Sequence, residues 1–393
     1  MDKNKSNYEV IVYHIGARDY YSVSEVFDRK KKLKFLITDY WFSKWKFLKV
    51  FKKKIDRRSN SNTSDERVKS YSLLKVLFVE FSKKIIQNKF NTWMFSSKLF
   101  TQFVIKKLKN KIQHDKKYVL WGYTGGNLEV QKEFKNSKNV FLIHNQIDPG
   151  LVYYEIEGLP DHKEKTAFLE RITEEWQLAD VILVNSEYSK KCLIQKNVNE
   201  SKIIVVPLIY KSKKLLLNKE FNKKLNIAFI GNINKLKGFD TFLEVARKEH
   251  AKYNFIAVGN THYDENYISE AKKYISFKGF LDRESLEKLY KNIDLLIFPT
   301  LCDGFGMVQL EAMSFGIPVI SSSNCAKVVI DNVNGFIVNS ADEIENRINY
   351  LDQNRQQLKE LSKNCLNRIN DFSEEIFLEK LNIGLSMFNI EIK

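Results

Sequence analysis

The sequence has few residues of the types that bind metals or form disulfides. Its 393 residues include only four cysteines and six histidines. None of these residues shows the pairwise spacing that is typical of zinc sites or redox motifs. We therefore expect no structural metal, and free thiols in a reducing compartment. The cysteines are Cys192, Cys302, Cys325 and Cys365.

Long apolar runs are also missing. No stretch approaches the roughly 18 consecutive apolar residues that a membrane-spanning helix needs. The first residues, MDKNKSNYEVIVYHIG, lead directly into a predicted strand and lack the apolar stretch and cleavage site of a secretory signal. The sequence therefore predicts a cytoplasmic protein.

Acidic residues are scarce in one part of the chain. The formal net charge is +16, and residues 41–118 contain 21 Lys and Arg but only 5 Asp and Glu. The rest of the chain has 43 residues of each sign, so the whole excess lies in this basic segment. Such a segment is a candidate surface for an anionic partner, either a membrane or nucleic acid. The simpler alternative is that its apolar side chains pack on the domain while its lysines stay solvated.

One stretch of the basic segment has a helical pattern. Apolar side chains recur there at helical spacing, which predicts a helix with one apolar face. These side chains are Leu99, Phe100, Phe103, Val104 and Leu108.

The order of the predicted elements indicates the fold class. The chain is too long for one ordinary domain, and each half alternates strands with helices, as parallel α/β sheets do. We predict two Rossmann-like, doubly wound α/β domains that face a central cleft. The expected parts are an N-terminal domain at 1–210, a linker at 211–225, a C-terminal domain at 226–372 and a final helix within 373–393 that packs back on the N-terminal domain.

The stretch PTLCDGFGMVQLEAMSFGIP, residues 299–318, places a carboxylate on an apolar face. Its glycines and its final Gly-Ile-Pro predict a helix over 306–315. Glu311 then has Met307 and Val308 one turn behind it. Burying an unpaired carboxylate there would be strongly unfavourable, because burying even a neutral polar group without a hydrogen bond costs roughly 2 to 7 kcal/mol. Asp303 has the position of a helix N-cap, but Glu311 does not, so Glu311 needs another partner.

A second loop, in FIGNINKLKGFD at residues 229–240, repeats this strand-loop-helix arrangement. Parallel sheets bind ligands at the carboxyl ends of their strands, and amides at helix starts favour anions. Lys237 precedes the next helix, although a loop lysine on its own is most simply a solvated surface residue. Two helix starts, one cation and the acids Asp303 and Glu311 together predict a ligand with phosphate and hydroxyl groups.

These motifs resemble those of a known family. CDGFGMVQLEAMSFGIPVISS followed by VVIDNVNGFIV is similar to the signature of the retaining glycosyltransferases of family four, which have the GT-B architecture. That signature has two acidic residues around Gly-Phe-Gly, which match Asp303 and Glu311. Asp303 stands where the family usually has the longer Glu. The resemblance extends to the N-terminal half, through IGARDYYSVSEVF, IHNQIDPG and RITEEWQLADVILVNSEYS.

The resemblance implies roles for individual residues. Glu311 would bind the ribose hydroxyls of a sugar nucleotide, Lys237 its diphosphate and Asp303 the transferred sugar. His144 matches a histidine that contacts the donor sugar, although a lone histidine after a strand is more often structural. Asp303, His144 and Lys237 are the implied catalytic residues. Further implied donor-binding residues are Gly16, Arg18, Gly231, Asn232, Gly304, Phe305 and Gly306.

One position departs from the family pattern. Asn232 stands where the family often has Arg, so the diphosphate would lack one cation that Arg18 or Lys235 could replace. No Asp-x-Asp occurs in the sequence, which predicts catalysis without a metal. The nucleotide-sugar is expected as a substrate, and no cofactor is expected.

The resemblance implies a retaining transferase that moves a sugar from a nucleotide-sugar to a glycan or lipid-linked glycan, in cell-surface polysaccharide synthesis. Its positive groups would stabilise the charge that grows on the leaving diphosphate. Residues 41–118 would then dock on the anionic inner face of the cell membrane, and no nucleic acid partner is expected.

Two other functions are compatible with parts of the sequence. A dinucleotide-dependent oxidoreductase needs Gly-x-Gly-x-x-Gly after a strand, and residues 304–309 lack the third glycine. A non-catalytic protein with this fold could use the basic segment to bind a membrane or nucleic acid. The combination of Lys237, Asp303 and Glu311 favours the enzyme, because a binding protein has no reason to keep the three together.

Overall fold

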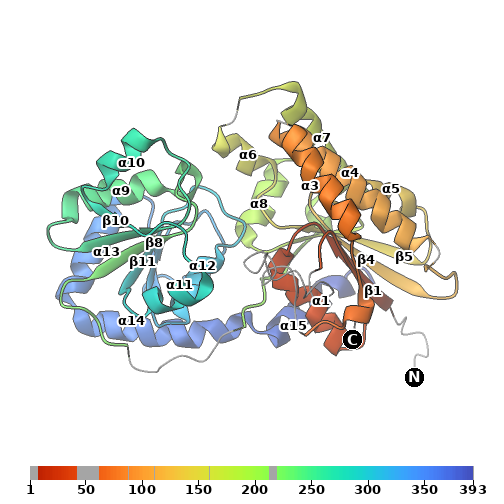
Figure 1. The fold of residues 1–393 in the computed structure, drawn as a ribbon. Coiled ribbons are helices and arrows are strands. Elements are labelled where there is room, and N and C mark those ends of the chain that lie inside the picture. Colours follow the sequence, from red (N-terminus) through yellow and green to blue (C-terminus); the bar gives the residue numbers. More distant parts are fainter. Residues whose placement is uncertain are drawn as a thin grey trace, which may run out of the picture.

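The fold is known from a computed structural model, which describes residues 8–41, 62–86, 88–109, 111–158, 160–211 and 219–392. Figure 1 shows two α/β domains side by side, each built on one sheet with helices packed around it. All strand pairs between named strands of the described residues are parallel. The predicted fold class, two Rossmann-like α/β domains in the GT-B architecture, is confirmed.

The N-terminal sheet has seven strands in the order β3-β2-β1-β4-β5-β6-β7. The direction of strand addition reverses between β1 and β4, which pair in register with Val10 opposite Val119. The strands read as continuous apolar runs, as expected where both faces of a sheet are covered. They are β1 (Tyr8–His14), β2 (Leu33–Thr38), β3 (Val68–Lys69), β4 (Lys117–Tyr123), β5 (Val140–Gln146), β6 (Val181–Val184) and β7 (Ile203–Val205).

Helices connect these strands. Sequence patterns predicted the helices after β1 and before β6, but not the short strand β3, whose two residues give no periodicity. The helical elements are η1 (Arg18–Tyr21), α1 (Ser22–Arg29), η4 (Asp65–Arg67), α3 (Leu73–Ile85), α4 (Lys89–Leu108), α5 (Leu128–Phe134), α6 (Leu151–Glu157), α7 (Lys163–Leu178), α8 (Glu187–Gln195) and η5 (Glu200–Lys202).

The C-terminal sheet has six strands in the order β10-β9-β8-β11-β12-β13. Its reversal point lies between β8 and β11, where a doubly wound sheet forms its ligand crevice. The strands are β8 (Asn226–Ile230), β9 (Asn254–Val258), β10 (Ile275–Phe277), β11 (Leu295–Phe298), β12 (Val319–Ser321) and β13 (Gly335–Ile337). The helical elements are η6 (Lys235–Lys237), α9 (Phe239–Glu249), α10 (Glu265–Ala271), α11 (Arg283–Tyr290), α12 (Met307–Met313), α13 (Ala341–Gln353), α14 (Arg355–Arg368), η7 (Ile369–Phe372) and α15 (Glu374–Ser386).

The last helix, α15, belongs to the core of the N-terminal domain. In Figure 1 it lies beside α1, away from the C-terminal sheet. Phe377, Leu381 and Leu385 are buried in one cluster with Val10 and Trp121 of the N-terminal sheet. The chain therefore returns to its first domain after it completes the second.

The basic segment is partly described. Residues 42–61 and part of the linker, 212–218, lie outside the described residues. The predicted helix corresponds to α4, whose Phe100, Val104 and Leu108 are fully buried against the sheet. For this helix, packing on the domain explains the apolar pattern.

The sequence predicted free thiols. All four cysteines are free, as predicted, and all four are buried. Within the described ranges, no helix combines the length and the apolar character needed to cross a bilayer. In the same ranges, no group of three or more His, Cys, Asp or Glu side chains is arranged to hold a metal ion.

Candidate functional site

Two loops meet at the reversal point of the C-terminal sheet. One follows β8 and contains Lys237, and the other follows β11 and contains Asp303. The loops are bonded to each other, since the Leu301 N–H and the Thr300 hydroxyl donate to the carbonyl of Leu236 at 2.9 and 3.1 Å. Gly238 makes the close approach possible. A Cβ there would lie 1.9 Å from the Pro299 carbonyl oxygen, and its φ of +75° also favours glycine.

Lys237 and Asp303 form an ion pair where the loops meet. Lys237 Nζ lies 2.5 Å from Asp303 Oδ2, and the side chains are 22% and 18% exposed. Backbone contacts fix both residues. Asp303 Oδ1 accepts from the Phe305 N–H at 3.1 Å, and the Lys237 N–H donates to Asn234 Oδ1 at 2.9 Å. The structure thus brings together one predicted cation and one predicted acid.

Glu311 lies on α12, which is shorter than the predicted helix over 306–315. Its Oε2 accepts a hydrogen bond from the Tyr290 hydroxyl at 3.1 Å, so one carboxylate oxygen has a partner within the protein. The Tyr290 ring in turn stacks on Phe315, with centroids 5.0 Å apart. Burial raises the pKa of Glu311, while Tyr290 and the positive charge of Arg283 favour its ionised form. Contact with a ribose stays a prediction.

The Gly-Phe-Gly loop contacts the N-terminal domain. A Cβ on Gly304 would lie 2.1 Å from the Ile147 carbonyl oxygen and 3.0 Å from Asp148 Cα. Ser189 Oγ donates to the Gly304 carbonyl at 3.4 Å. Phe305 is buried and packs edge-on against Phe372, with centroids 5.7 Å apart. The loop that carries Asp303 is therefore held between the two domains.

His144 lies at the end of β5 and is fully buried. Its Nε2 is 3.0 Å from Gln146 Oε1, which accepts, and its Nδ1 is 3.3 Å from the amide nitrogen of Asn127, which donates. This arrangement fits the neutral ring, and burial lowers the pKa of His144 to about 4. The structure places His144 within a polar network of the core rather than with Lys237 and Asp303. Its predicted contact with a donor sugar remains a prediction.

Sequence reasoning did not single out Asp148, which follows β5 in the loop against Gly304. Its Oδ1 accepts from Gln146 Nε2 at 2.6 Å and from the Gly150 N–H at 2.9 Å. Gln146 therefore links the His144 network to the loop that meets the second domain. An acidic residue just after the carboxyl end of a parallel strand was the available signal.

The predicted donor-binding residues occupy both domains. Gly231, with a φ of +146°, and the exposed Asn232 directly follow β8. Gly306, with a φ of +83°, is the N-cap of α12. In the N-terminal domain, Gly16 donates its N–H to Asp39 Oδ1 at 3.0 Å, and Arg18 opens η1.

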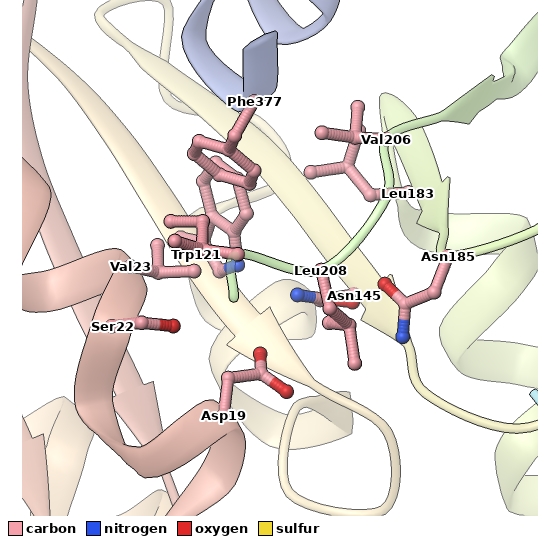
Figure 2. Close-up of a pocket in the computed structure, with 11 residues that line it drawn as sticks. Asp19, Ser22, Val23, Trp121, Asn145, Leu183, Asn185, Val206, Leu208 and Phe377 are labelled. Atoms are coloured by element: carbon pink, nitrogen blue, oxygen red, sulfur yellow. The ribbon is translucent and has the colours of Figure 1, made fainter. Parts of the chain in front are cut away.

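Figure 2 shows a small cavity beside η1 and the start of α1 in the N-terminal domain. Asp19, Asn145 and Asn185 lie on its polar side, below the rings of Trp121 and Phe377. It has room for about one water molecule. Within the described residues, Asn145 Oδ1 and Trp121 Nε1 have no hydrogen-bond partner, so a water there would satisfy polar groups. The cavity is too small for a sugar.

Comparison with known proteins identifies the second domain. Residues 212–368 match the model of the family described as "Glycosyl transferases group 1". The C-terminal domain matches this family. The matched residues include the Lys237 loop, the Gly-Phe-Gly loop and Glu311, so the glycosyltransferase motif forms the site described above.

Relatives with curated names include glycosyltransferases of polysaccharide biosynthesis. The chain is 30% identical over 143 residues to the O-antigen biosynthesis glycosyltransferase WclY of Escherichia coli, covering 34% of this chain and 38% of WclY. It is 25% identical over 242 residues to the capsular polysaccharide biosynthesis glycosyltransferase CapM of Staphylococcus aureus, covering 54% and 62%. In each case the chain covers less than two thirds of the relative's length.

Among solved structures, HepE of Anabaena in complex with UDP superposes with a TM-score of 0.63. The match covers 96% of this chain and 99% of HepE at 13% identity, which shows a shared fold.

The buried histidine gives a testable pH dependence. The pKa of His144 is about 4 in the folded protein, against about 6.5 for an unfolded chain, so the unfolded state binds the proton more readily between these values. Stability must therefore fall as pH drops from 6.5 to 4, by about 3 kcal/mol in total from this group. The change His144→Asn removes this term. We expect urea titrations to show that the unfolding free energy of the variant falls less than that of the wild type as the pH is lowered to 4.

The neighbouring carboxylate acts in the opposite direction. Burial raises the pKa of Glu175 to about 7, although three backbone N–H groups favour its ionised form. Glu175 is present in both proteins, so its own pH dependence is common to them and the expected difference has the sign set by His144. A difference that does not change with pH would contradict a neutral, buried His144.

Proposed function

We propose that the protein is a retaining glycosyltransferase that moves a sugar from a nucleotide-sugar to a glycan or lipid-linked glycan during cell-surface polysaccharide synthesis. The family match of the C-terminal domain and the names of WclY and CapM support this function. The observation that carries the proposal is the ion pair of Lys237 and Asp303, which lies at the sheet's reversal point with its loop against the other domain.

In the proposed reaction, Lys237 exchanges its contact with Asp303 for the donor diphosphate. Its charge then stabilises the negative charge that develops as the bond from sugar to phosphate breaks. Asp303 is released at the same time to face the sugar. Glu311, oriented by Tyr290, accepts hydrogen bonds from the ribose hydroxyls with its second oxygen.

We propose that transfer retains the configuration of the anomeric carbon and needs no metal ion. Retention rests on the resemblance of the Asp303 to Glu311 signature to family four. Metal independence rests on the lysine at the diphosphate position and on a sequence without Asp-x-Asp. A cytoplasmic location at the inner membrane face, through the basic segment, belongs to the same proposal.

A transfer assay tests these points. Because HepE is solved with UDP, uridine diphosphate sugars are the first donors to supply, together with other nucleotide-sugars and with lipid extracts as acceptors. We expect release of nucleoside diphosphate from at least one donor, unchanged in EDTA, and an anomeric configuration in the product that matches the donor. Loss of turnover in EDTA that magnesium restores would contradict metal independence. No release from any donor would favour the non-catalytic alternative.

A further inference from the structure

Helix α3 has an apolar face that the rest of the described chain does not cover. Val76 and Val79 are buried on the side that packs on the domain. On the opposite side, Leu74 is 80% exposed and Phe81 is 65% exposed. Spacings of three and four residues place the exposed side chains in one stripe along the helix. The α3 stripe consists of Leu74, Leu77, Phe78, Phe81 and Ile85.

This pattern differs from that of an ordinary surface helix. A surface helix has one apolar side toward the core and a polar side toward water, whereas α3 is apolar on both. Contiguous exposed apolar patches mark sites of interaction with proteins or membranes. Figure 1 shows α3 and α4 on the N-terminal domain, away from the C-terminal sheet, so the second domain does not cover the stripe.

The charges around the stripe are almost all positive. Helix α3 contains three lysines and one acidic residue, Glu80. That carboxylate is already occupied, because it accepts from the Tyr40 hydroxyl at 2.5 Å and pairs with Lys83 at 2.8 Å. Lys84 is exposed, and Lys75 lies over the rings of Tyr71 and Phe103. The neighbouring helix α4 adds exposed Lys98, Lys106 and Lys107.

This charge distribution discriminates between three candidate partners for the stripe. A second copy of the chain would bring two lysine-rich helices together, and like charges oppose such an interface. The preceding residues 42–61 contain eight Lys and Arg and one Asp, so they would meet the same repulsion. An anionic bilayer offers apolar chains for the stripe and negative headgroups for the lysines.

We propose that α3 docks in the plane of an anionic membrane surface, with the α3 stripe inserted among the headgroups and the lysines of α3 and α4 on the phosphates. A helix of 13 residues is about 20 Å long, so the stripe forms a contact of roughly three helical turns. This inference specifies the membrane contact of the proposed function and rests on it for its biological purpose. It assigns insertion to α3 rather than to α4, whose apolar face is buried.

The test is sedimentation of the full chain with phosphatidylcholine vesicles that contain or lack phosphatidylglycerol. We expect the wild type to bind the anionic vesicles at low salt, to bind neutral ones weakly and to be released as salt screens the lysines. Phe78→Ser with Phe81→Ser should lower the partition coefficient about tenfold or more, because two inserted rings are lost. The matched control is Ile383→Ser with Met387→Ser, which removes exposed apolar side chains from the region of α15 and should leave binding unchanged.

The outcomes separate this inference from the proposed function. Equal binding of the α3 variant and the wild type, or no binding of the wild type to anionic vesicles, would overturn it. A wild-type dimer in light scattering that the α3 variant loses would assign the stripe to a second copy and would also overturn it. Loss of vesicle binding in the α3 variant alone supports the inference even if no donor is turned over, since the assay does not use catalysis.

Discussion

Lys237→Ala should lower sugar transfer ten- to hundredfold. The substitution removes a charged hydrogen bond to the diphosphate, and such a bond contributes about 1.5 to 3 kcal/mol. It also leaves the Asp303 carboxylate without the cation that lies 2.5 Å away. Both effects act on the reacting part of the donor, so kcat is expected to fall as well as donor affinity.

The measurement is steady-state release of nucleoside diphosphate, with a matched control. Lys272→Ala removes an exposed lysine of the same domain, from the end of α10, and should retain the wild-type rate. The Lys237 side chain is 22% exposed and its ammonium group contacts a carboxylate, so the melting temperature of its variant should stay close to that of the wild type. A Lys237→Ala enzyme that transfers sugar at the wild-type rate would remove this lysine from the mechanism.

Gly304→Ala should lower transfer at least as much, through geometry rather than charge. The added Cβ would lie 2.1 Å from the Ile147 carbonyl oxygen, so backbone of one domain must move away from backbone of the other. Asp303 is adjacent and moves with the loop. A displacement of about 1 Å at a catalytic group can reduce a rate by about a hundredfold.

The matched control for this substitution is Gly126→Ala. A Cβ on Gly126 would have its nearest neighbours at an ordinary 3.7 Å, so little change in activity is expected. For Gly304→Ala, circular dichroism should show intact secondary structure while donor turnover is lost. Turnover of Gly304→Ala equal to that of Gly126→Ala would show that the contact between the loop and the N-terminal domain is not needed for activity.

Much of the fold could be predicted because buried parallel strands have a simple pattern. Runs such as the apolar residues of β4 and β11 are short, continuous and bounded by loop residues, and the structure has strands at both. Strand β3 has only two residues and joins the sheet by pairing with β2, a long-range contact that leaves no local pattern. Helix α3 was not predicted from the sequence of the basic segment, because apolar residues on both of its sides obscure the helical period.

The site could be predicted in part. Sequence spacing indicated that Asp303 and Lys237 belong together, because the carboxyl ends of neighbouring parallel strands converge. The partner of Glu311 within the protein could not be inferred, since Tyr290 lies on a different helix and reaches Glu311 only through tertiary packing. The burial of His144 was equally hidden, because Gln146 and Asn127 surround it from separate elements.

Titration of nucleoside diphosphates, beginning with UDP, into the wild type, Glu311→Gln and Lys272→Ala measures donor binding at the candidate site. We propose that the C-terminal domain binds its donor through Glu311 and the loops at the reversal point. We predict saturable binding to the wild type and to Lys272→Ala, with affinity about tenfold or more lower for Glu311→Gln, because the neutral amide loses a charged hydrogen bond to the ribose. Equal affinity of Glu311→Gln and the wild type for the same nucleotide would contradict the claim.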